Sequence, residues 1–207
     1  RRFFSIIVPA HNEAGELRKT VEMMLQQRYP ASCYEIIIVE NGSTDHTWQI
    51  ACHLARQVAG HRGQSPRIRA LQSSKGVSRA KNCGLQNVAA HSDWVVFCDA
   101  DTHLGPHFLT ELNTSLHRVR QQPAVATCSI RPRNSTSMHE QAWFRLYDLI
   151  HRVTRSSYSI QMAPVQVARR VGFNTDLERA EDLLFIKGCL RSGRFFFFTT
   201  DQVSTST

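Results

Sequence analysis

Two aspartates stand directly after an apolar run in the middle of the chain. Residues 94–97 read Trp-Val-Val-Phe, which is typical of a strand buried on both faces, and Cys98 separates this run from Asp99 and Asp101. Ligands of open α/β sheets lie beyond the carboxyl ends of the strands. Two carboxylates placed there repel each other unless a cation joins them, so the pair predicts a site for a divalent metal that carries a diphosphate. A D-x-D pattern alone also occurs in solvated turns, and the prediction therefore depends on its surroundings.

Three further apolar runs precede this pair, and each is followed by a helical pattern. The predicted strands are Phe4–Val8, Tyr34–Val39, Arg67–Leu71 and Trp94–Cys98, and the predicted helices between them cover 13–28, 44–58 and 76–88. Repetition of strand and helix is the signature of a parallel sheet with right-handed crossovers. The loops that follow the strands are then expected to gather along one edge, which is the predicted site.

The second half of the chain is less regular. It predicts helices at 106–119, 139–153 and 179–191, and strands at 124–130 and 195–198. The helix at 139–153 carries a broad apolar face, formed by Trp143, Phe144, Leu146, Tyr147 and Ile150. Because amphipathic helices generally pack on cores, we prefer a core-facing helix. The alternative is a helix at a membrane surface, with Arg152 and Arg155 at its basic end.

Bulk composition sets the class of protein. With 207 residues, 42% hydrophobic and 20% charged, the chain is long enough for one domain with a real core, and it has no apolar run that could cross a bilayer. A net charge of +8 favours an anionic partner such as a nucleotide or a phospholipid surface. Nucleic acid is disfavoured, because the basic residues are scattered rather than arranged in a stripe.

The six cysteines stand singly and mostly among apolar residues, which indicates reduced core cysteines in a reducing compartment. We therefore expect a cytoplasmic location, with the cytoplasmic face of a membrane as the alternative. The chain opens on Arg1 rather than Met, so we expect it to be a piece of a longer protein.

Five motifs follow one another in a recognisable order. They are IIVPAHNEA at 6–14, IIIVENGSTDHT at 36–47, KGVSRAKNCGL at 75–85, FCDADT at 97–102 and RAEDLLF at 179–185. In this order they resemble the family 2 glycosyltransferases. The resemblance implies a GT-A fold, which is a Rossmann-like, mostly parallel α/β sheet flanked by helices with a smaller mixed acceptor-side half. It implies a single catalytic domain over 1–207, with a nucleotide-sugar-binding half (1–103) and an acceptor-side half (104–207).

The first two motifs would hold the nucleotide. Pro9 and Ala10 form a rigid turn of small surface against which a flat base can lie, and Glu13 and Glu40 are acceptors suited to a base imino group or a ribose hydroxyl. The family commonly has two aspartates before the Gly-Ser of the second motif. Here the second of them is Asn41, so one charge is lost and both UDP and GDP stay open as the nucleotide.

The third and fourth motifs would hold the diphosphate. Lys81 stands where the family usually has arginine; it supplies a positive charge without the bidentate fork, and the alternative is a solvated helix residue. By resemblance, Asp99 touches the ribose and Asp101 binds the metal. Mg²⁺ and Mn²⁺ prefer hard oxygen ligands, and there they offset the charge on the departing diphosphate.

Asp182 matches the catalytic base of the family. An inverting transfer needs a carboxylate on the face opposite the leaving group to take the proton of the acceptor hydroxyl. The alternative is an acidic pair favoured by the helix dipole. Glu181 lies about 100° away around the helix, so we do not expect it to share the role. Residues 159–168 lack the glycines of the usual acceptor loop, and no Gln-x-x-Arg-Trp motif is present, which favours single addition.

The expected function is transfer of a sugar, with inversion and with a divalent metal, from a UDP- or GDP-linked donor to an acceptor hydroxyl or a lipid phosphate. A lipid-linked acceptor would bring peripheral membrane contact. Two alternatives stay open. A degenerate, non-catalytic nucleotide-sugar-binding module agrees with Asn41 and the reduced acceptor loop. A sugar nucleotidyltransferase would carry a Gly-rich basic loop after the first strand, and VPAHNEA has none.

Overall fold

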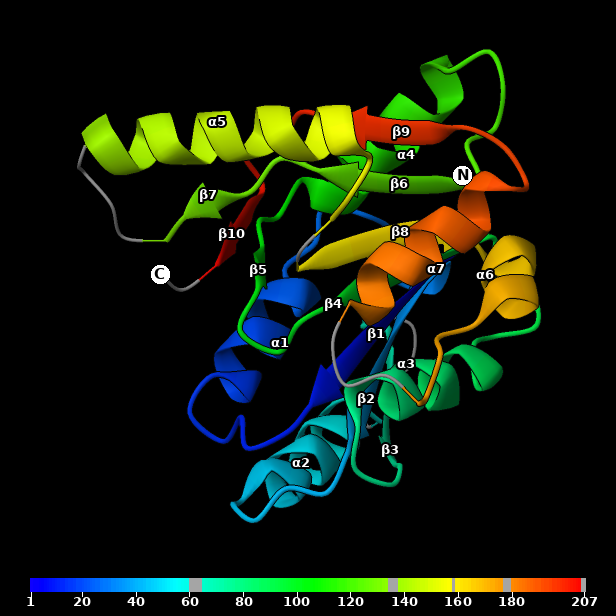
Figure 1. The fold of residues 1–207 in the computed structure, drawn as a ribbon. Coiled ribbons are helices and arrows are strands. Elements are labelled where there is room, and N and C mark those ends of the chain that lie inside the picture. The colour runs from blue at the N-terminus through cyan, green and yellow to red at the C-terminus, as the bar shows by residue number, and fades with distance from the viewer. Residues whose placement is uncertain (60–64, 134–137, 158, 177–179, 206–207) are drawn as a thin grey trace.

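A seven-stranded sheet runs through the middle of the molecule, in the order β3-β2-β1-β4-β8-β6-β9 (Figure 1). The computed structural model describes residues 1–59, 65–133, 138–157, 159–176 and 180–205. The strands of this sheet are β1 (Phe4–Ala10), β2 (Tyr34–Glu40), β3 (Arg67–Gln72), β4 (Trp94–Cys98), β6 (Val125–Cys128), β8 (Ile160–Pro164) and β9 (Phe195–Phe198).

The first four strands are parallel, as the alternation of strand and helix predicted. β8 lies antiparallel between β4 and β6, whereas β9 is parallel to β6. The predicted α/β fold with a mostly parallel sheet is therefore confirmed. β8 itself was not predicted, because Gln161 and Pro164 interrupt its apolar run and hide the strand pattern.

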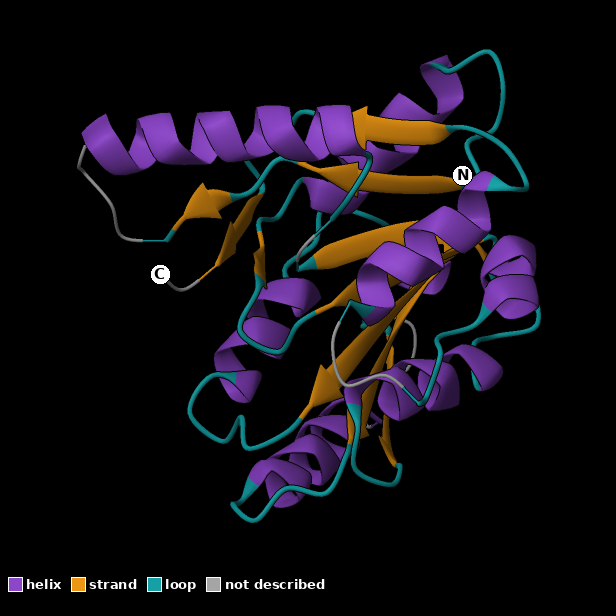
Figure 2. Cartoon of the chain, viewed as in Figure 1, coloured by secondary structure: helices purple, strands orange, loops and turns teal. Residues whose placement is uncertain are grey.

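Helices cover both faces of the sheet (Figure 2). Alternate residues of the buried strands point to opposite faces, so Ile6 and Ile36 belong to one core cluster while Ile7 and Ile37 belong to the other. The helices on the first face are α1 (Leu17–Leu25), α2 (Thr47–Ala59) and α4 (Phe108–Arg118). The helices on the second face are α3 (Val77–Gln86), α6 (Val165–Val171) and α7 (Glu181–Leu190).

Two predicted boundaries near the first strand were wrong. β1 continues through Pro9 to Ala10 instead of ending at Val8, and both of these residues are buried. The ladder to β4 ends at Ile7, so Pro9 lies where β1 has a neighbour on one side only and its missing N–H is tolerated. α1 begins at Leu17 rather than at residue 13, because the residues before it form a turn.

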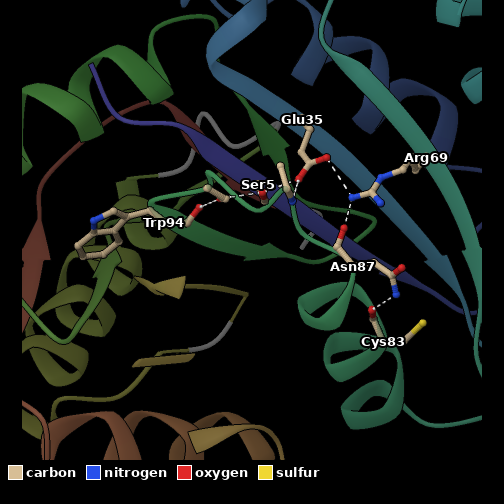
Figure 3. A network of polar contacts seen from close by, with 8 residues as sticks. Ser5, Glu35, Arg69, Cys83, Asn87 and Trp94 are labelled. Carbon is tan, nitrogen blue, oxygen red and sulfur yellow. Dashed lines mark hydrogen bonds and ion pairs between the residues drawn. The ribbon is translucent and has the colours of Figure 1, made fainter. Parts of the chain in front are cut away.

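A polar network joins the strands at the edge opposite their carboxyl ends (Figure 3). Glu35 at the start of β2 accepts hydrogen bonds from the Ser5 hydroxyl (2.7 Å) and the Ala89 N–H (2.7 Å). It also pairs with the Arg69 guanidinium at 3.0 Å, which in turn donates to the Asn87 carbonyl. Three neighbouring strands and the end of α3 are thus tied together, which fixes the register that positions the opposite edge.

A second, small sheet lies beside the carboxyl ends of the main strands. It contains β5 (His103–Leu104), β10 (Val203–Thr205) and β7 (Arg131–Pro132), in that order. A 3₁₀ turn, η1 (Ala31–Cys33), precedes β2. All six cysteines are free thiols. None of the helices within the described ranges is long and apolar enough to cross a membrane.

The C-terminal end of helix α5 (Met138–Thr154) lies at the carboxyl end of β9, and the helix extends from there over β7 (Figure 1). Of its predicted apolar face, Phe144 packs partly against the core and Tyr147 is half-buried, but Trp143, Leu146 and Ile150 are 60%, 49% and 45% exposed. The preferred interpretation of a core-facing helix was therefore wrong for these three side chains. β9 is the last strand of the sheet, so α5 lies past the surface that could cover them.

Candidate active site

The predicted site residues meet where the parallel strands end. Ala10, Glu40 and Gln72 lie side by side at the ends of β1, β2 and β3, because the register pairs each with the next. Asp99 follows directly after β4, the other neighbour of β1. Residues that are up to 89 positions apart in the sequence (10 to 99) thus line one edge of the sheet.

Glu40 organises the loop after β2. Its carboxylate accepts the Ser43 N–H at 2.5 Å and the Gln72 side-chain amide at 3.0 Å. Burial by itself would raise the pKa of Glu40, but these hydrogen bonds outweigh burial and lower it, so the carboxylate is charged. The adjacent Asn41 is buried, and its side-chain oxygen has no hydrogen-bond partner among the residues that the structure describes, which leaves one acceptor open at this edge.

The loop after β1 is held by polar contacts to the loop after β2. The carboxylate of Asp45 caps α2 through the Thr47 N–H (2.9 Å) and also accepts the Ala14 N–H (3.1 Å). Asp45 therefore satisfies an N–H at the start of α2 and also joins the two loops. The Glu13 N–H donates to the Thr47 hydroxyl at 2.8 Å, which fixes the backbone of the predicted acceptor Glu13 beside β1.

Acidic side chains accumulate at the ends of β1 and β4. Burial raises the pKa of Glu13, and the carboxylate of Asp101 raises it further. Burial also raises the pKa of Asp99 to about 7; Lys81 opposes this rise, whereas Asp182 and Asp101 add to it. Carboxyls that raise one another's pKa mark a region of negative potential that a cation would relieve.

These residues fit a divalent ion that arrives with its substrate. No three metal-binding side chains are grouped into a ready-made metal site in the part of the chain that the structure describes. Mg²⁺ is normally held by one or two carboxylates together with phosphate oxygens, and the Asp99–Asp101 pair has the number and type of carboxylates that such a site needs. The Thr102 hydroxyl lies 3.4 Å from the Asp101 carboxylate, which orients it.

An arginine that the sequence analysis missed lies next to this acidic pair. Arg133, directly after β7, donates to the Asp101 carbonyl and pairs with Glu16 at 2.7 Å. Its hydrogen bond lowers the pKa of Glu16. Burial lowers the pKa of the nearby His103, and the positive charge of Arg133 adds to this effect. The arginine in R-P-R-N was hard to detect, because only the pairing of β7 with β10 brings it to the site.

Asp182 lies in the first turn of α7 and contacts Lys81. The Lys81 ammonium is 2.5 Å from the Asp182 carboxylate and 3.9 Å from that of Glu181, and the Lys81 side chain is 1% exposed. Lys81 is therefore a buried ion-pair partner and not the solvated residue of the alternative interpretation. Glu181 also faces this ammonium, although at the longer distance.

The environment of Asp182 shifts its acidity. Burial raises the pKa of Asp182, while the charge and the hydrogen bond of Lys81 and a hydrogen bond from Gln161 oppose the rise. Gln161 also accepts from the Lys81 ammonium at 3.4 Å. The lone glutamine in the apolar run of β8 was the only signal in the sequence for this partner.

A clasp between α3 and the loop after α6 positions this corner. The Asn82 amide donates to the Phe173 carbonyl (2.8 Å) and accepts the Phe173 N–H (2.9 Å). The Phe173 ring stacks on Phe185 of α7 at 4.3 Å and lies 5.1 Å from the Lys81 ammonium. A groove of about 790 Å³ is lined by the first turn of α3 and by residues 175–176.

The chain matches the model of glycosyl transferase family 2 over residues 5–198. It belongs to this family. Among the relatives, the uncharacterized glycosyltransferase YibD of Escherichia coli K12 is 33% identical over 111 residues, which cover 53% of this chain and 29% of YibD. A Methanococcus voltae dolichyl N-acetyl-alpha-D-glucosaminyl phosphate 3-beta-D-2,3-diacetamido-2,3-dideoxy-beta-D-glucuronosyltransferase is 30% identical over 125 residues, covering 60% of this chain and 37% of that protein.

Solved structures share the fold of this family 2 domain at low sequence identity. A crystal structure of S. aureus TarS 1-349 has a TM-score of 0.78 at 17% identity, covering 99% of this chain and 60% of that one. The mannosyltransferase PcManGT from Pyrobaculum calidifontis, in complex with GDP-Man and Mn²⁺, has a TM-score of 0.71 at 21% identity, covering 100% and 57%. The fold is therefore the GT-A fold of these glycosyltransferases. The chain spans less than two thirds of each of these relatives.

Proposed function

We propose that this family 2 domain transfers a sugar from a UDP- or GDP-linked donor to an acceptor hydroxyl or lipid phosphate, with inversion and with a divalent ion. The observation that carries the proposal is the position of Asp182. It is a partly buried carboxylate with a raised pKa, held by Lys81, and it interacts electrostatically with Asp99 at the proposed donor edge. This position supports a catalytic role for Asp182 beside the proposed donor site.

The donor would lie along the ends of β1, β2 and β4. In this proposal the base lies at the end of β1, next to the buried Pro9 and Ala10, while the carboxylates of Glu13 and Glu40 and the open oxygen of Asn41 accept its N–H groups or a ribose hydroxyl. Asp99 contacts the ribose and Asp101 holds the divalent ion. When bound, that ion offsets the charge that develops on the departing diphosphate.

Asp182 would act on the opposite side of the sugar. Its carboxylate takes the proton of the acceptor hydroxyl while the acceptor oxygen bonds to the anomeric carbon and the bond to the diphosphate breaks. Lys81 keeps the carboxylate in place through the 2.5 Å contact. A direct contact of Lys81 with the diphosphate, as the sequence suggested, would require it to leave Asp182.

The structural neighbours support a nucleotide donor but not one nucleotide. TarS has been crystallised in complex with UDP-GlcNAc, and PcManGT with GDP-Man and Mn²⁺. Both UDP and GDP are therefore carried forward as candidates for this chain. The M. voltae relative is named as a transferase acting on a dolichyl phosphate derivative, which supports testing lipid-linked acceptors as well as simple hydroxyls.

A panel of UDP- and GDP-sugars with Mn²⁺ or Mg²⁺ tests the donor site by thermal shift. A ligand at a hundred times its dissociation constant stabilises the folded state by about 2.7 kcal/mol, so the true donor is readily detected. Asp101→Asn should remove most of the stabilisation by the donor that depends on the metal ion. Unchanged donor affinity in this variant, with and without EDTA, would show that Asp101 does not hold the metal.

Asp182→Asn tests catalysis separately from binding. It retains the size of the side chain and removes the base, so it should lower kcat for a hydroxyl acceptor by about 10² to 10⁴ and leave donor binding nearly intact. A phosphate acceptor is already ionised at neutral pH, so the loss should then be much smaller. A wild-type domain that binds a donor but turns none over, even with cell extract as the source of acceptor, would favour the non-catalytic binding module. Formation of a nucleotide sugar from a nucleoside triphosphate would favour the nucleotidyltransferase.

A further inference from the structure

An apolar stripe runs along the outer face of α5. Among the described residues, six large apolar side chains are strongly exposed, and five of them are on this helix. At 100° per residue these five positions fall within about 120° of the helix circumference. The stripe consists of Trp143, Leu146, Leu149, Ile150 and Val153, which are between 45% and 72% exposed.

The opposite face of α5 is already occupied by the protein. Phe144 packs partly against the core, and Tyr147 contacts His151 edge-to-face at 4.2 Å. Asp148 accepts the Ile130 N–H (3.3 Å) and pairs with Arg131 (2.9 Å). The helix is thus anchored by one face, and the apolar stripe on the other face is not needed for that attachment.

Positive charge continues the stripe at its C-terminal end. A groove of about 720 Å³ is lined there by Arg152, Arg155 and Arg194, all exposed, and by the edge strand β9. Arg152 lies over the Phe197 ring (4.8 Å) and donates to the Thr199 hydroxyl (2.9 Å), so its guanidinium has a defined position. Among the described residues, no carboxylate lines this groove.

The C-terminal end of α5 lies near the edge of the sheet that carries the candidate active site. The chain goes from Thr154, the last residue of α5, to Ile160 at the start of β8, and Ile160 pairs with Cys98 at the carboxyl end of β4. In Figure 1, α5 extends past the carboxyl ends of β6 and β9 over the small sheet.

We propose that α5 docks this domain on an anionic lipid bilayer. The stripe enters the interfacial region of the bilayer, and the three arginines contact lipid phosphates. Trp143 suits the interface, where amphipathic rings concentrate. The charges favour this occupant over a second copy of the chain, because each copy carries a net charge of +8 and repels another, whereas an anionic bilayer attracts it. Docking goes beyond the proposed activity and does not require it.

Co-sedimentation with lipid vesicles tests the proposal. We expect the wild-type protein to bind vesicles of phosphatidylcholine containing about 30% phosphatidylserine at low salt, and to bind pure phosphatidylcholine far more weakly. The double variant Leu149→Gln/Val153→Gln should weaken binding more than about tenfold, because it removes two inserted apolar side chains. Leu184→Gln, which changes a 43% exposed leucine on α7, is the matched control and should leave vesicle binding unchanged.

The charge component has its own pair of variants. Arg155→Gln/Arg194→Gln should weaken binding to the anionic vesicles by about fivefold per arginine. Arg56→Gln/Arg67→Gln removes the same charge from exposed residues of α2 and β3, at the opposite end of the molecule, and should have little effect (Figure 1). Equal losses from the two pairs would mean that net charge alone attracts the protein, and would overturn docking through α5.

Two other results would also overturn the proposal. One is failure of the wild-type protein to bind anionic vesicles at low salt. The other is a dimer in light scattering that dissociates in Leu149→Gln/Val153→Gln, which would assign the stripe to a second copy. Donor binding measured without vesicles in the same preparations keeps failure of docking distinct from failure of the proposed function.

Discussion

Lys81→Met removes one partner of the buried ion pair beneath the proposed base. The Lys81 side chain is 1% exposed and that of Asp182 is 18% exposed, with 2.5 Å between their charged atoms. Removing one partner of a buried pair typically costs about 3–5 kcal/mol, because the other charge is left without compensation. Asp182 retains some contact with solvent, so we expect a loss near the lower value, about 3 kcal/mol at neutral pH.

The loss should depend on pH in a defined direction. Burial raises the pKa of Asp182 above its ordinary value, and Lys81 opposes this rise, so the variant should have a still higher Asp182 pKa. A carboxyl with a higher pKa in the folded state binds its proton more tightly there, so stability falls as pH rises from the unfolded pKa to the folded pKa. The difference in free energy of unfolding between wild type and the variant should therefore be largest at neutral pH. It should shrink toward acidic pH, where Asp182 is neutral.

Urea unfolding followed by circular dichroism at neutral and mildly acidic pH measures this effect. With an m-value of about 3 kcal/mol/M, the expected loss lowers the neutral-pH midpoint by about 1 M. Lys187→Met, which changes an exposed lysine of α7, the helix that carries Asp182, is the control and should stay within about 0.5 kcal/mol of wild type. A loss below about 1 kcal/mol, or an equal loss at both pH values, would refute the idea that Lys81 compensates a charged Asp182.

Three further substitutions test how the elements around the site are held, each by urea unfolding. Gly84→Ala should lower the free energy of unfolding by about 1–3 kcal/mol, because its new Cβ would lie 2.5 Å from an Ile7 methyl. At an uncrowded helix position the same substitution raises the free energy of unfolding by about 1 kcal/mol. Gly15→Ala, with nothing within 4 Å of the new Cβ, is its control, and equal midpoints would contradict the close packing of α3 on β1. Glu35→Ala should cost about 3 kcal/mol by leaving its buried partners unpaired; a neutral outcome would mean that the network does not hold the strand starts. Asn82→Ala should cost about 1–3 kcal/mol through the unpaired backbone at residue 173, and no change would show that water replaces the clasp.

Local pattern was sufficient for most of the donor side. The apolar runs ending at Val39 and Cys98 predicted strands, and a strand delivers the residue that follows it to the edge of the sheet wherever the sheet lies. Asp45 was predictable as a cap because capping depends on residues two or three positions away. Both effects are short-range, and the sequence alone therefore indicated the fold class and the edge on which the site residues collect.

The surroundings of the proposed base were decided by tertiary structure. Lys81 and Asp182 are 101 residues apart, and their contact depends on how α3 and α7 pack on one face of the sheet, which no local spacing encodes. β8 forms a strand because β4 and β6 flank it, although its own sequence is weakly patterned. The apolar periodicity of α5 is the same for a buried and an exposed helix. A helix can bury no more surface than its neighbours offer, and the sheet ends at β9. The face of α5 that carries Phe144 is therefore covered by protein, whereas Leu149 and Val153 stay exposed.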